Sequence, residues 1–351
     1  MIKLKILIIH PGGIGDLVTF TPALKILRNN FPKAIIDIFI IYTPEAKYVL
    51  QEEKIINRIF KFNWSKSNFL NKLKFIHELR KEKYDLSIIP TDVNPLRGEF
   101  FSFLFGAKVK VGEKRENKKS LFYTQTSLLY KNKKRSESNI DLLKAIGLKI
   151  NFPLPSPFLD VTSKEREFVD NFLIRNNFEN KILIGFHPGC NENQKFRRWP
   201  KENFIELGNK ILNDLENAFI LLFGGPEEIR LCLEIKSKLD KNTIVISGYS
   251  LKQVAALIDK CKIFISSDSG LGHIASTTKT NLISIFGPTD YKRAAPFGRE
   301  RIYVLKEKCR YPSDFISFKN YDKERTHTCL KKITPDRVFN KIKEILGERW
   351  F

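Results

Sequence analysis

The chain has 351 residues, 42% of them hydrophobic, so it is longer than one core usually holds and can bury two. Its formal net charge of +22 permits nucleic acid, an anionic membrane surface or a strongly acidic substrate as a partner. No segment approaches the apolar length of a membrane span, and the opening run Lys5–His10 is too short for a signal peptide. We expect a cytoplasmic protein of two domains.

The first half of the chain alternates short apolar runs with helical patterns. Continuous apolar strands separated by helices indicate a parallel sheet covered on both faces. The stretch Glu113–Arg135, rich in Lys and Asn, is interpreted as a mobile basic excursion. The predicted strands are Leu4–Ile9, Ile35–Ile41, Ile55–Phe62, Leu86–Pro90 and Lys108–Val111, and the clearest helices are Asp16–Asn30 and Ser67–Lys83.

The alternation breaks at Asn151–Pro157 and restarts after a predicted helix over 163–177. Further strands are predicted at 182–186, 218–223, near 244 and from 263, and helices from 200, from 226 and over 251–259. A last helix begins with Thr334 as its cap and Pro335 at its first position, and stops at Gly347.

These patterns predict the division of the chain into domains. We expect an N-terminal Rossmann-like domain over 1–160, a linker helix within 161–180 and a C-terminal Rossmann-like domain over 181–333. The closing helix, within 334–351, is expected to pack back toward the N-terminal domain. Two consecutive βαβ domains imply a central cleft between them.

Five cysteines are scattered along the chain without a CxxC pair, so neither a zinc site nor a disulfide framework is expected. Cys309 and Cys329 flank a polar insert across which they could approach each other. A cytoplasmic location argues against a standing bond between them. The sequence leaves open whether these two cysteines pair.

The segment Ile263–Asp290 predicts a strand, a polar turn, a helix and a second strand. This order places a phosphate-sized anion on a helix N-terminus, where Ser269, Gly270 and Leu271 would offer backbone N–H groups. Asp268 would lie at the carboxyl end of the strand, where open α/β sheets bind their ligands. The alternative is a turn in which the aspartate and serine only cap the helix.

A second glycine-rich turn follows the first strand and ends in an aspartate. Gly12, Gly13 and Gly15 deliver the carboxylate of Asp16 to the start of a helix. The pattern is not GxGxxG, so it supports a dinucleotide site only weakly. Asp16 is either the N-cap of the helix or a general base.

Three more positions are candidates for ligand contacts in the second half. Arg197 is one of three cations near a strand end that could neutralise a pyrophosphate, unless the loop is an ordinary solvated one. Glu228, at a helix start, could accept from ribose hydroxyls or simply complement the helix dipole. His273 follows Ser269 by about one helical turn and would share its face, unless it is structural.

Taken together, the motifs resemble those of the ADP-heptose:lipopolysaccharide heptosyltransferases, glycosyltransferase family 9. The resemblance spans almost the whole chain and rests on the order of the motifs. They are GGIGD, HPG…RRWP, FGGPEE, SLKQVAALIDKC, SSDSGLGHIAS, FGPTD and the tail THTCLKKITPDRV. It implies a GT-B fold, with the donor bound mainly by the C-terminal domain and the acceptor by the N-terminal one.

The resemblance also implies inverting transfer without a metal or another cofactor, and the chain contains no Asp-x-Asp. Asp16 takes the place of the family's catalytic base, beside the acceptor-side glycines of its turn. The donor positions are Arg197, Glu228, Tyr249, Asp268, Ser269, Gly270, Leu271 and His273, with Tyr249 matching a residue that lines the nucleotide base.

Two departures from the family pattern stand near the diphosphate position. The family usually has Lys ahead of the RWP or HWP element, where this chain has Arg197, which keeps the charge but presents a planar fork. The loop Cys190–Lys195 also differs from the commoner short form.

The sequence therefore predicts a metal-independent glycosyltransferase that moves a heptose from ADP-heptose to an anionic lipopolysaccharide inner-core acceptor. We expect a monomer, peripherally associated with the inner leaflet of the inner membrane, that binds no nucleic acid. A different nucleotide-sugar donor or glycan acceptor is the nearer alternative. A non-enzymatic binder of nucleic acid or an anionic surface is the remote one, motivated only by the net charge of +22.

Overall fold

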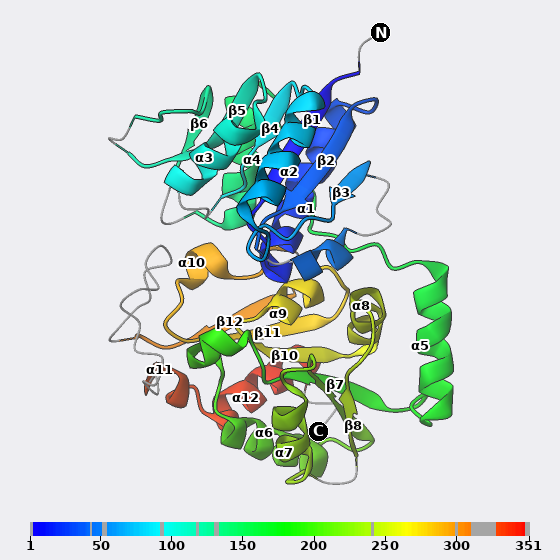
Figure 1. The fold of residues 1–351 in the computed structure, drawn as a ribbon. Helices are drawn as coiled ribbons and strands as arrows, with labels where there is room; N and C mark the ends of the chain where they lie inside the picture. Colours follow the sequence, from blue (N-terminus) through cyan, green and yellow to red (C-terminus); the bar gives the residue numbers. More distant parts are fainter. Residues whose placement is uncertain are drawn as a thin grey trace. The chain divides into compact units, whose positions relative to one another are not determined.

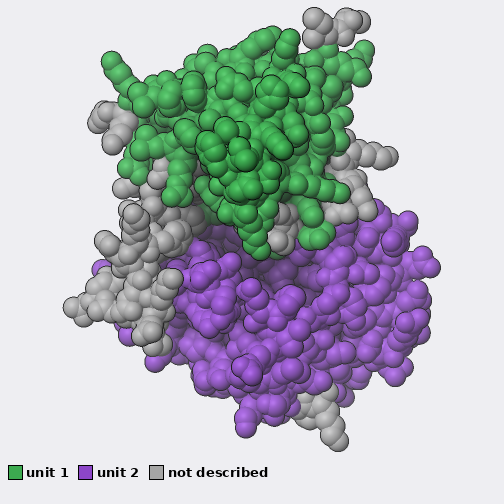
Figure 2. All heavy atoms as spheres, viewed as in Figure 1, with its two compact units in different colours: residues 1–158 green, residues 159–351 purple. Residues whose placement is uncertain are grey.

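The structure is a computed structural model that describes residues 3–42, 44–50, 55–91, 95–116, 119–129, 133–239, 242–298, 301–309 and 328–347. The chain forms two compact units, residues 1–158 and 159–351 (Figure 2). The sequence placed the end of the first domain at 160. The predicted linker helix, α5 (Ser163–Arg175), belongs to the second unit, where it packs against α8.

The first unit is a six-stranded parallel sheet with the order β3-β2-β1-β4-β5-β6 (Figure 1). Its buried strands are continuous apolar runs, as a parallel sheet covered on both faces requires. Its strands are β1 (Lys5–His10), β2 (Ile35–Ile40), β3 (Arg58–Phe60), β4 (Leu86–Ile88), β5 (Val109–Lys114) and β6 (Gln125–Leu128). Its helices are α1 (Ile14–Asn30), the 3-10 helix η1 (Pro44–Val49), α2 (Phe69–Lys81), α3 (Pro95–Phe105) and α4 (Arg135–Ala145).

The second unit repeats this design, with the strand order β12-β11-β10-β7-β8-β9 (Figure 1). Its strands are β7 (Ile182–His187), β8 (Ala218–Phe223), β9 (Thr243–Ile246), β10 (Ile263–Ser267), β11 (Asn281–Phe286) and β12 (Ile302–Lys306). Its other helices are the 3-10 helix η2 (Glu192–Arg197), α6 (Lys201–Asp214), α7 (Ile229–Lys236), α8 (Leu251–Lys260), α9 (Gly270–Ala275), α10 (Tyr291–Ala294), α11 (Thr328–Lys331) and α12 (Pro335–Leu346).

Numbered within its own unit, each sheet has the order 3-2-1-4-5-6, the Rossmann arrangement. The prediction of two parallel α/β domains is confirmed. In the first unit α2 and α3 cover one face of the sheet, while α1 and α4 pack together. In the second unit α6, α7 and α12 cover one face of the sheet. Helix α8 packs against both α5 and α9.

Local sequence signals set several helix ends. Ser250 caps α8 by a reciprocal pair of hydrogen bonds with Gln253, which donates its backbone N–H to Ser250 Oγ at 3.2 Å and accepts from Ser250 N at 2.9 Å. Thr334 Oγ1 accepts from the N–H of Arg337 at the start of α12, and Gly347 ends that helix with a φ of +84°. These caps and stops of α12 are as the sequence predicted.

Three findings differ from the sequence expectations or complete them. Within the stretch interpreted as a mobile excursion, β6 pairs in parallel with β5. The closing helix α12, expected to pack back toward the N-terminal domain, buries Val338, Phe339 and Ile342 in the core of the second unit.

Cys309 and Cys329 approach each other as free thiols. The pKa of Cys329 is raised to about 12, mainly by burial and to a smaller extent by a hydrogen bond with Cys309. No described helix has the length and apolar composition needed to cross a membrane.

Candidate functional site

The strand order decides where the predicted site residues lie. Open α/β sheets bind ligands where the order reverses, outside the carboxyl ends of the first and fourth strands. These strands are β1 and β4 in the first unit, and β7 and β10 in the second. Asp16 follows β1 and Asp268 follows β10. Each carboxylate therefore lies at the reversal point of its own sheet.

Asp16 is the third residue of α1, and Gly13 is the N-cap of that helix, with a φ of +88°. The interpretation of Asp16 as an N-cap is therefore wrong. A Cβ at Gly13 would collide with Asp16 Oδ2, so this position needs glycine both for its backbone conformation and for the carboxylate beside it. Gly12 lies in the turn before α1, and Gly15 is the second residue of that helix, as predicted.

Arg135 holds the carboxylate of Asp16 from the protein side. Its Nη1 donates to Asp16 Oδ1, and its own side chain is only 7% exposed, whereas that of Asp16 is 42% exposed. Arg135 is the first residue of α4, which is fastened near β4 because Asn139 Oδ1 accepts the N–H of Thr91 at 2.9 Å. The pair thus fixes one carboxylate oxygen and leaves the group open to solvent.

The buried side chain of His10 accepts a hydrogen bond from the same turn. It is 1% exposed, and its Nδ1 accepts the N–H of Gly12 at 3.1 Å. Burial lowers the pKa of His10 to about 3, against the opposing effect of a backbone hydrogen bond with Asp16. The imidazole is therefore neutral at physiological pH and carries its proton on Nε2.

In the second unit, Arg197 and Asp268 form a buried pair. Arg197 Nε lies 3.5 Å from Asp268 Oδ2, and the two side chains are 10% and 5% exposed. Trp199 anchors the loop that carries this arginine, since its N–H donates to Ser267 Oγ at 3.1 Å and its Nε1 donates to the carbonyl of Ile333 at 2.8 Å. The alternative of a solvated basic loop at Arg197 is therefore wrong.

Ser269 is the N-cap of α9, and its Oγ accepts the N–H of Gly272 at 3.4 Å. Gly270 and Leu271 are the first helical residues, so their N–H groups point out of the helix end without a partner inside it. His273 lies in the same short helix and is only 5% exposed. The polar turn thus has the strand-turn-helix form that the sequence predicted.

Glu228 directly precedes α7, and protein groups surround its carboxylate. Oε2 accepts the N–H of Gly225 at 2.8 Å, and Oε1 lies 3.8 Å from His187 Nε2. His187 donates from Nδ1 to the carbonyl of Phe223 at 2.8 Å, which fixes the orientation of its ring. Any Cβ at Gly189 would collide with Glu228. A ribose would therefore meet a carboxylate that is already oriented.

Tyr249 follows β9, and β7 and β8 separate that strand from β10. Its ring centroid lies 5.2 Å from that of Phe168 and 6.1 Å from that of Phe172, both on α5, and the residue is 37% exposed. Tyr249 thus belongs to an aromatic cluster and lies apart from the Asp268 turn. The carboxyl ends of β10, β7, β8 and β9 deliver, in that order, Asp268, Arg197, Glu228 and Tyr249.

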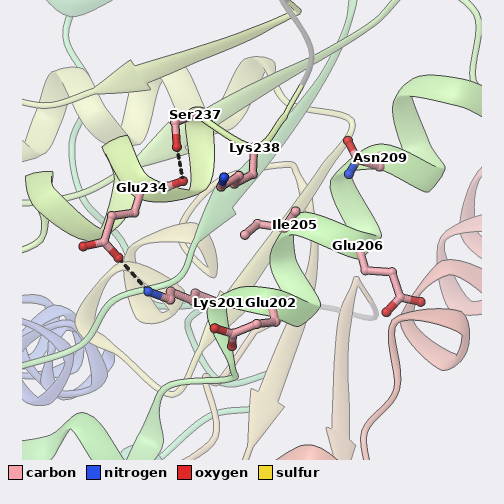
Figure 3. Close-up of a pocket in the computed structure, with 8 residues that line it drawn as sticks. All are labelled: Lys201, Glu202, Ile205, Glu206, Asn209, Glu234, Ser237 and Lys238. Carbon is pink, nitrogen blue, oxygen red and sulfur yellow. Dashed lines mark hydrogen bonds and ion pairs between the residues drawn. The ribbon is translucent and has the colours of Figure 1, made fainter.

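A surface groove of about 700 Å³ lies elsewhere, between α6 and α7 (Figure 3). An ion pair between Lys201 and Glu234, at 2.8 Å, crosses it, and its walls contain none of the predicted site residues. Within the described ranges, no group of three or more His, Cys, Asp or Glu side chains is arranged to hold a metal ion.

Comparison with known proteins identifies the family. The family model described as glycosyltransferase family 9 (heptosyltransferase) matches residues 72–316. The chain belongs to this family. It is a glycosyltransferase, as the motifs predicted.

Relatives and solved structures cover the chain almost completely. Lipooligosaccharide heptosyltransferase 2 of Haemophilus ducreyi is 25% identical over 98% of this chain and 100% of its own. The structure of Escherichia coli ADP-heptose lps heptosyltransferase II is 22% identical, covers 98% of both chains and has a TM-score of 0.75. An E. coli heptosyltransferase with ADP-2-deoxy-2-fluoro heptose is 19% identical, with a TM-score of 0.71 over 97% of this chain and 99% of its own. The predicted GT-B fold is confirmed.

Sequence reasoning missed two residues of the site, Arg135 and His187. Arg135 lies in a basic stretch where any one arginine resembles its neighbours, and 119 positions separate it from Asp16. His187 ends an apolar strand and carries no local signal of its contact with Glu228. Only the strand order brings each of them to its partner.

The burial of His10 predicts a pH dependence of stability. Its pKa falls from 6.5 to about 3 on folding, so only the unfolded chain takes up a proton between these values. The free energy of unfolding should therefore fall with decreasing pH below 6.5, by up to about 1.4 kcal/mol per pH unit from this group. His10→Asn can still accept from Gly12 but does not titrate. Urea unfolding of both proteins from pH 7 to 4 should show the wild type losing more stability, and parallel curves would contradict this.

Proposed function

We propose that this glycosyltransferase transfers a heptose from ADP-heptose to a lipopolysaccharide inner-core acceptor, with inversion and without a metal. The observation that carries the proposal is the Asp16 carboxylate, held at the reversal point by Arg135 while 42% of its side chain is exposed. The names of the relatives support the transferred heptose and the acceptor class, because they include lipooligosaccharide and lipopolysaccharide heptosyltransferases, and the name of one similar structure includes ADP-heptose.

Asp16 is proposed as the general base. Its carboxylate takes the proton of an acceptor hydroxyl, the freed oxygen forms a bond to the anomeric carbon, and the bond from that carbon to the diphosphate oxygen breaks. ADP leaves with the electron pair of the broken bond. Arg135 occupies one carboxylate oxygen and stops the group from turning, so the open side of the carboxylate faces the acceptor in a fixed direction.

The donor is proposed to lie along the carboxyl edge of the second sheet. Arg197 and the N–H groups of Gly270 and Leu271 would meet the diphosphate, whose charge grows as the sugar departs. Next to them, Asp268, Ser269 and His273 would contact the sugar side. The order of strands then supports Glu228 as the ribose contact and Tyr249 as the contact to the base, since each lies one strand further along the edge.

The place of action follows from the acceptor. Because lipopolysaccharide carries a lipid, we propose that the protein associates peripherally with the cytoplasmic face of the inner membrane. We propose that it does so as a monomer. The net charge of +22 supports this, because anionic lipids and a phosphate-bearing acceptor attract basic side chains.

The reaction is tested by incubating the purified protein with ADP-heptose and, in separate reactions, with heptose-free lipopolysaccharide and with lipopolysaccharide that already carries one heptose. ADP release and a mass increase of one heptose on the acceptor are expected. Parallel reactions with UDP-, GDP- and CDP-sugars should release little nucleotide. Release from another donor alone would replace the proposed donor while keeping the reaction type, and no transfer from any donor would remove the proposal.

Replacement of Asp16 separates catalysis from binding. Asp16→Asn should lower turnover by about 10²–10⁴-fold, since the amide cannot take the proton, while ADP still binds. Arg135→Gln should lower kcat by roughly 10–100-fold through loss of one charge-assisted contact, with the donor KM unchanged. Arg135→Lys should recover part of the loss.

Lys144→Gln is the matched control for Arg135, because it removes a cation, 49% exposed and paired with Asp141, from the same helix. Its turnover should equal that of the wild type. An Asp16→Asn enzyme with near wild-type turnover would leave Asp16 without a catalytic role.

Replacement of Arg197 tests the diphosphate contact. Arg197→Ala should weaken ADP binding about 10- to 100-fold, and the difference should shrink at high salt because the wild-type contact is screened. Arg197→Lys should recover the affinity if a point charge suffices, and little of it if the planar fork is needed. Lys195→Ala, which removes a 57% exposed cation from the same loop, is the control. Calorimetry showing equal affinities for all variants would contradict a role for Arg197 in donor binding.

A further inference from the structure

The first unit carries an apolar surface that its own fold does not use. Of the sixteen exposed large apolar side chains among the described residues, eight come from α2, α3 and the segment that follows β5. They are Phe69, Leu70 and Leu73 on α2, Leu96, Phe100 and Phe103 on α3, and Leu121 and Phe122 in the segment, with exposures from 37% to 73%. We call these eight residues the α2–α3 apolar face.

The parts of this face on α2 and α3 are joined by an aromatic side chain beneath them. Trp64 meets the ring of Phe101 on α3 edge-on, with centroids 5.0 Å apart. Lys72 of α2 lies over the ring of Trp64, at 5.4 Å from its centroid. The two helices also pack directly against each other. Their outward side chains therefore belong to one surface.

The segment at 121–122 is fixed against α3 in the same way. Glu99 is 5% exposed, and its Oε2 accepts the N–H groups of Leu121 at 2.7 Å and Phe122 at 3.0 Å. The ring of Phe122 lies 4.7 Å from that of Phe103. The carboxylate of α3 is thus turned inward, and its contacts hold two apolar side chains outward.

Helix α3 carries large apolar side chains on both its buried and its exposed side. Phe101 and Phe105 face the core, where they are 5% and 1% exposed, while Leu96, Phe100 and Phe103 face outward. A helix of this composition is normally buried on every side. An exposed position therefore calls for an apolar environment outside the unit.

Cations border the face. On α2 the charged residues other than histidine are four cations and one acid, namely Lys72, Lys74, Arg80, Lys81 and Glu78, and Lys66 is exposed just before the helix. On α3 the exposed charge is Arg97, because Glu99 is buried. Two copies of this face would bring their cations together, which disfavours self-association. An anionic bilayer offers the opposite charge above an apolar interior.

We propose that the α2–α3 apolar face inserts into an anionic phospholipid leaflet, with its lysines against the lipid headgroups. This specifies the membrane contact of the proposed function and rests on it. Helices α2 and α3 follow strands of the parallel sheet, so their N-terminal ends, with Phe69 and Leu96, lie toward the same edge as Asp16. A saccharide anchored in that leaflet would therefore be presented on the side of the sheet where Asp16 lies.

Vesicle binding without donor or acceptor tests the proposal independently of the reaction. The wild type should co-sediment with vesicles of equal parts phosphatidylcholine and phosphatidylglycerol, and weakly with phosphatidylcholine alone. Leu70→Ser and Phe100→Ser should each lower the partition coefficient about tenfold by removing inserted apolar area. Lys66→Gln and Lys74→Gln should each lower it about fivefold, on the anionic vesicles only.

The matched control is Ile174→Ser with Leu233→Ser, which removes exposed apolar side chains of the second unit, 55% and 52% exposed. It should bind vesicles like the wild type. Circular dichroism and transfer to a deacylated acceptor should be unchanged in all these variants. The proposal is overturned if the wild type does not bind anionic vesicles. It is also overturned if the Leu70→Ser and Phe100→Ser variants bind them as strongly as the wild type. Loss of a wild-type dimer in sedimentation, with vesicle binding unchanged in Leu70→Ser or Phe100→Ser, would also overturn it, because the face would then be a contact between two copies of the chain.

Discussion

In each unit, one arginine holds one aspartate at the point where the strand order reverses. Arg135 reaches Asp16 in the first unit, and Arg197 reaches Asp268 in the second. Both aspartates follow central strands, where helix N-termini and the ends of parallel strands meet. Arg135, Arg197 and Asp268 are buried charges, which are costly without a partner, so each pairing favours one geometry of its turn.

The two pairs differ in solvent exposure, and this gives them different chemistry. The Asp16 side chain is 42% exposed, so under the proposed function it would exchange a proton with the acceptor while Arg135 keeps it in place. The Asp268 side chain is 5% exposed, so its charge chiefly offsets that of Arg197. Under the proposed function, a diphosphate next to Arg197 would meet a guanidinium that is partly neutralised. In that arrangement the N–H groups at the start of α9 would supply the rest of the positive potential.

The sequence revealed both sheets and most of the candidate site because they depend on local patterns. Buried parallel strands are continuous apolar runs, and the turns after β1 and β10 use glycines that few other structures require. What it did not reveal depends on distant partners. The strand β6 reads QTSL and lies at a sheet edge, so it lacks an apolar signal, and the apolar stripe of α12 does not say which core it joins. The partnership of Arg135 with Asp16 exists only once α1 and α4 pack together.

Trp199 links, through its side chain, the segment just before α12 to the loop that carries Arg197. Its backbone is fastened to Ser267 at the end of β10 and its ring nitrogen to Ile333, just before α12. Because this anchor lies after Arg197 in the chain, residues 190–196 can change in length while the arginine stays in register with the sheet. The same coupling transmits disturbance in the other direction. A truncation before Ile333 would remove the carbonyl that accepts from the ring and loosen a loop more than a hundred positions earlier, although the lost segment contributes no side chain to the predicted site.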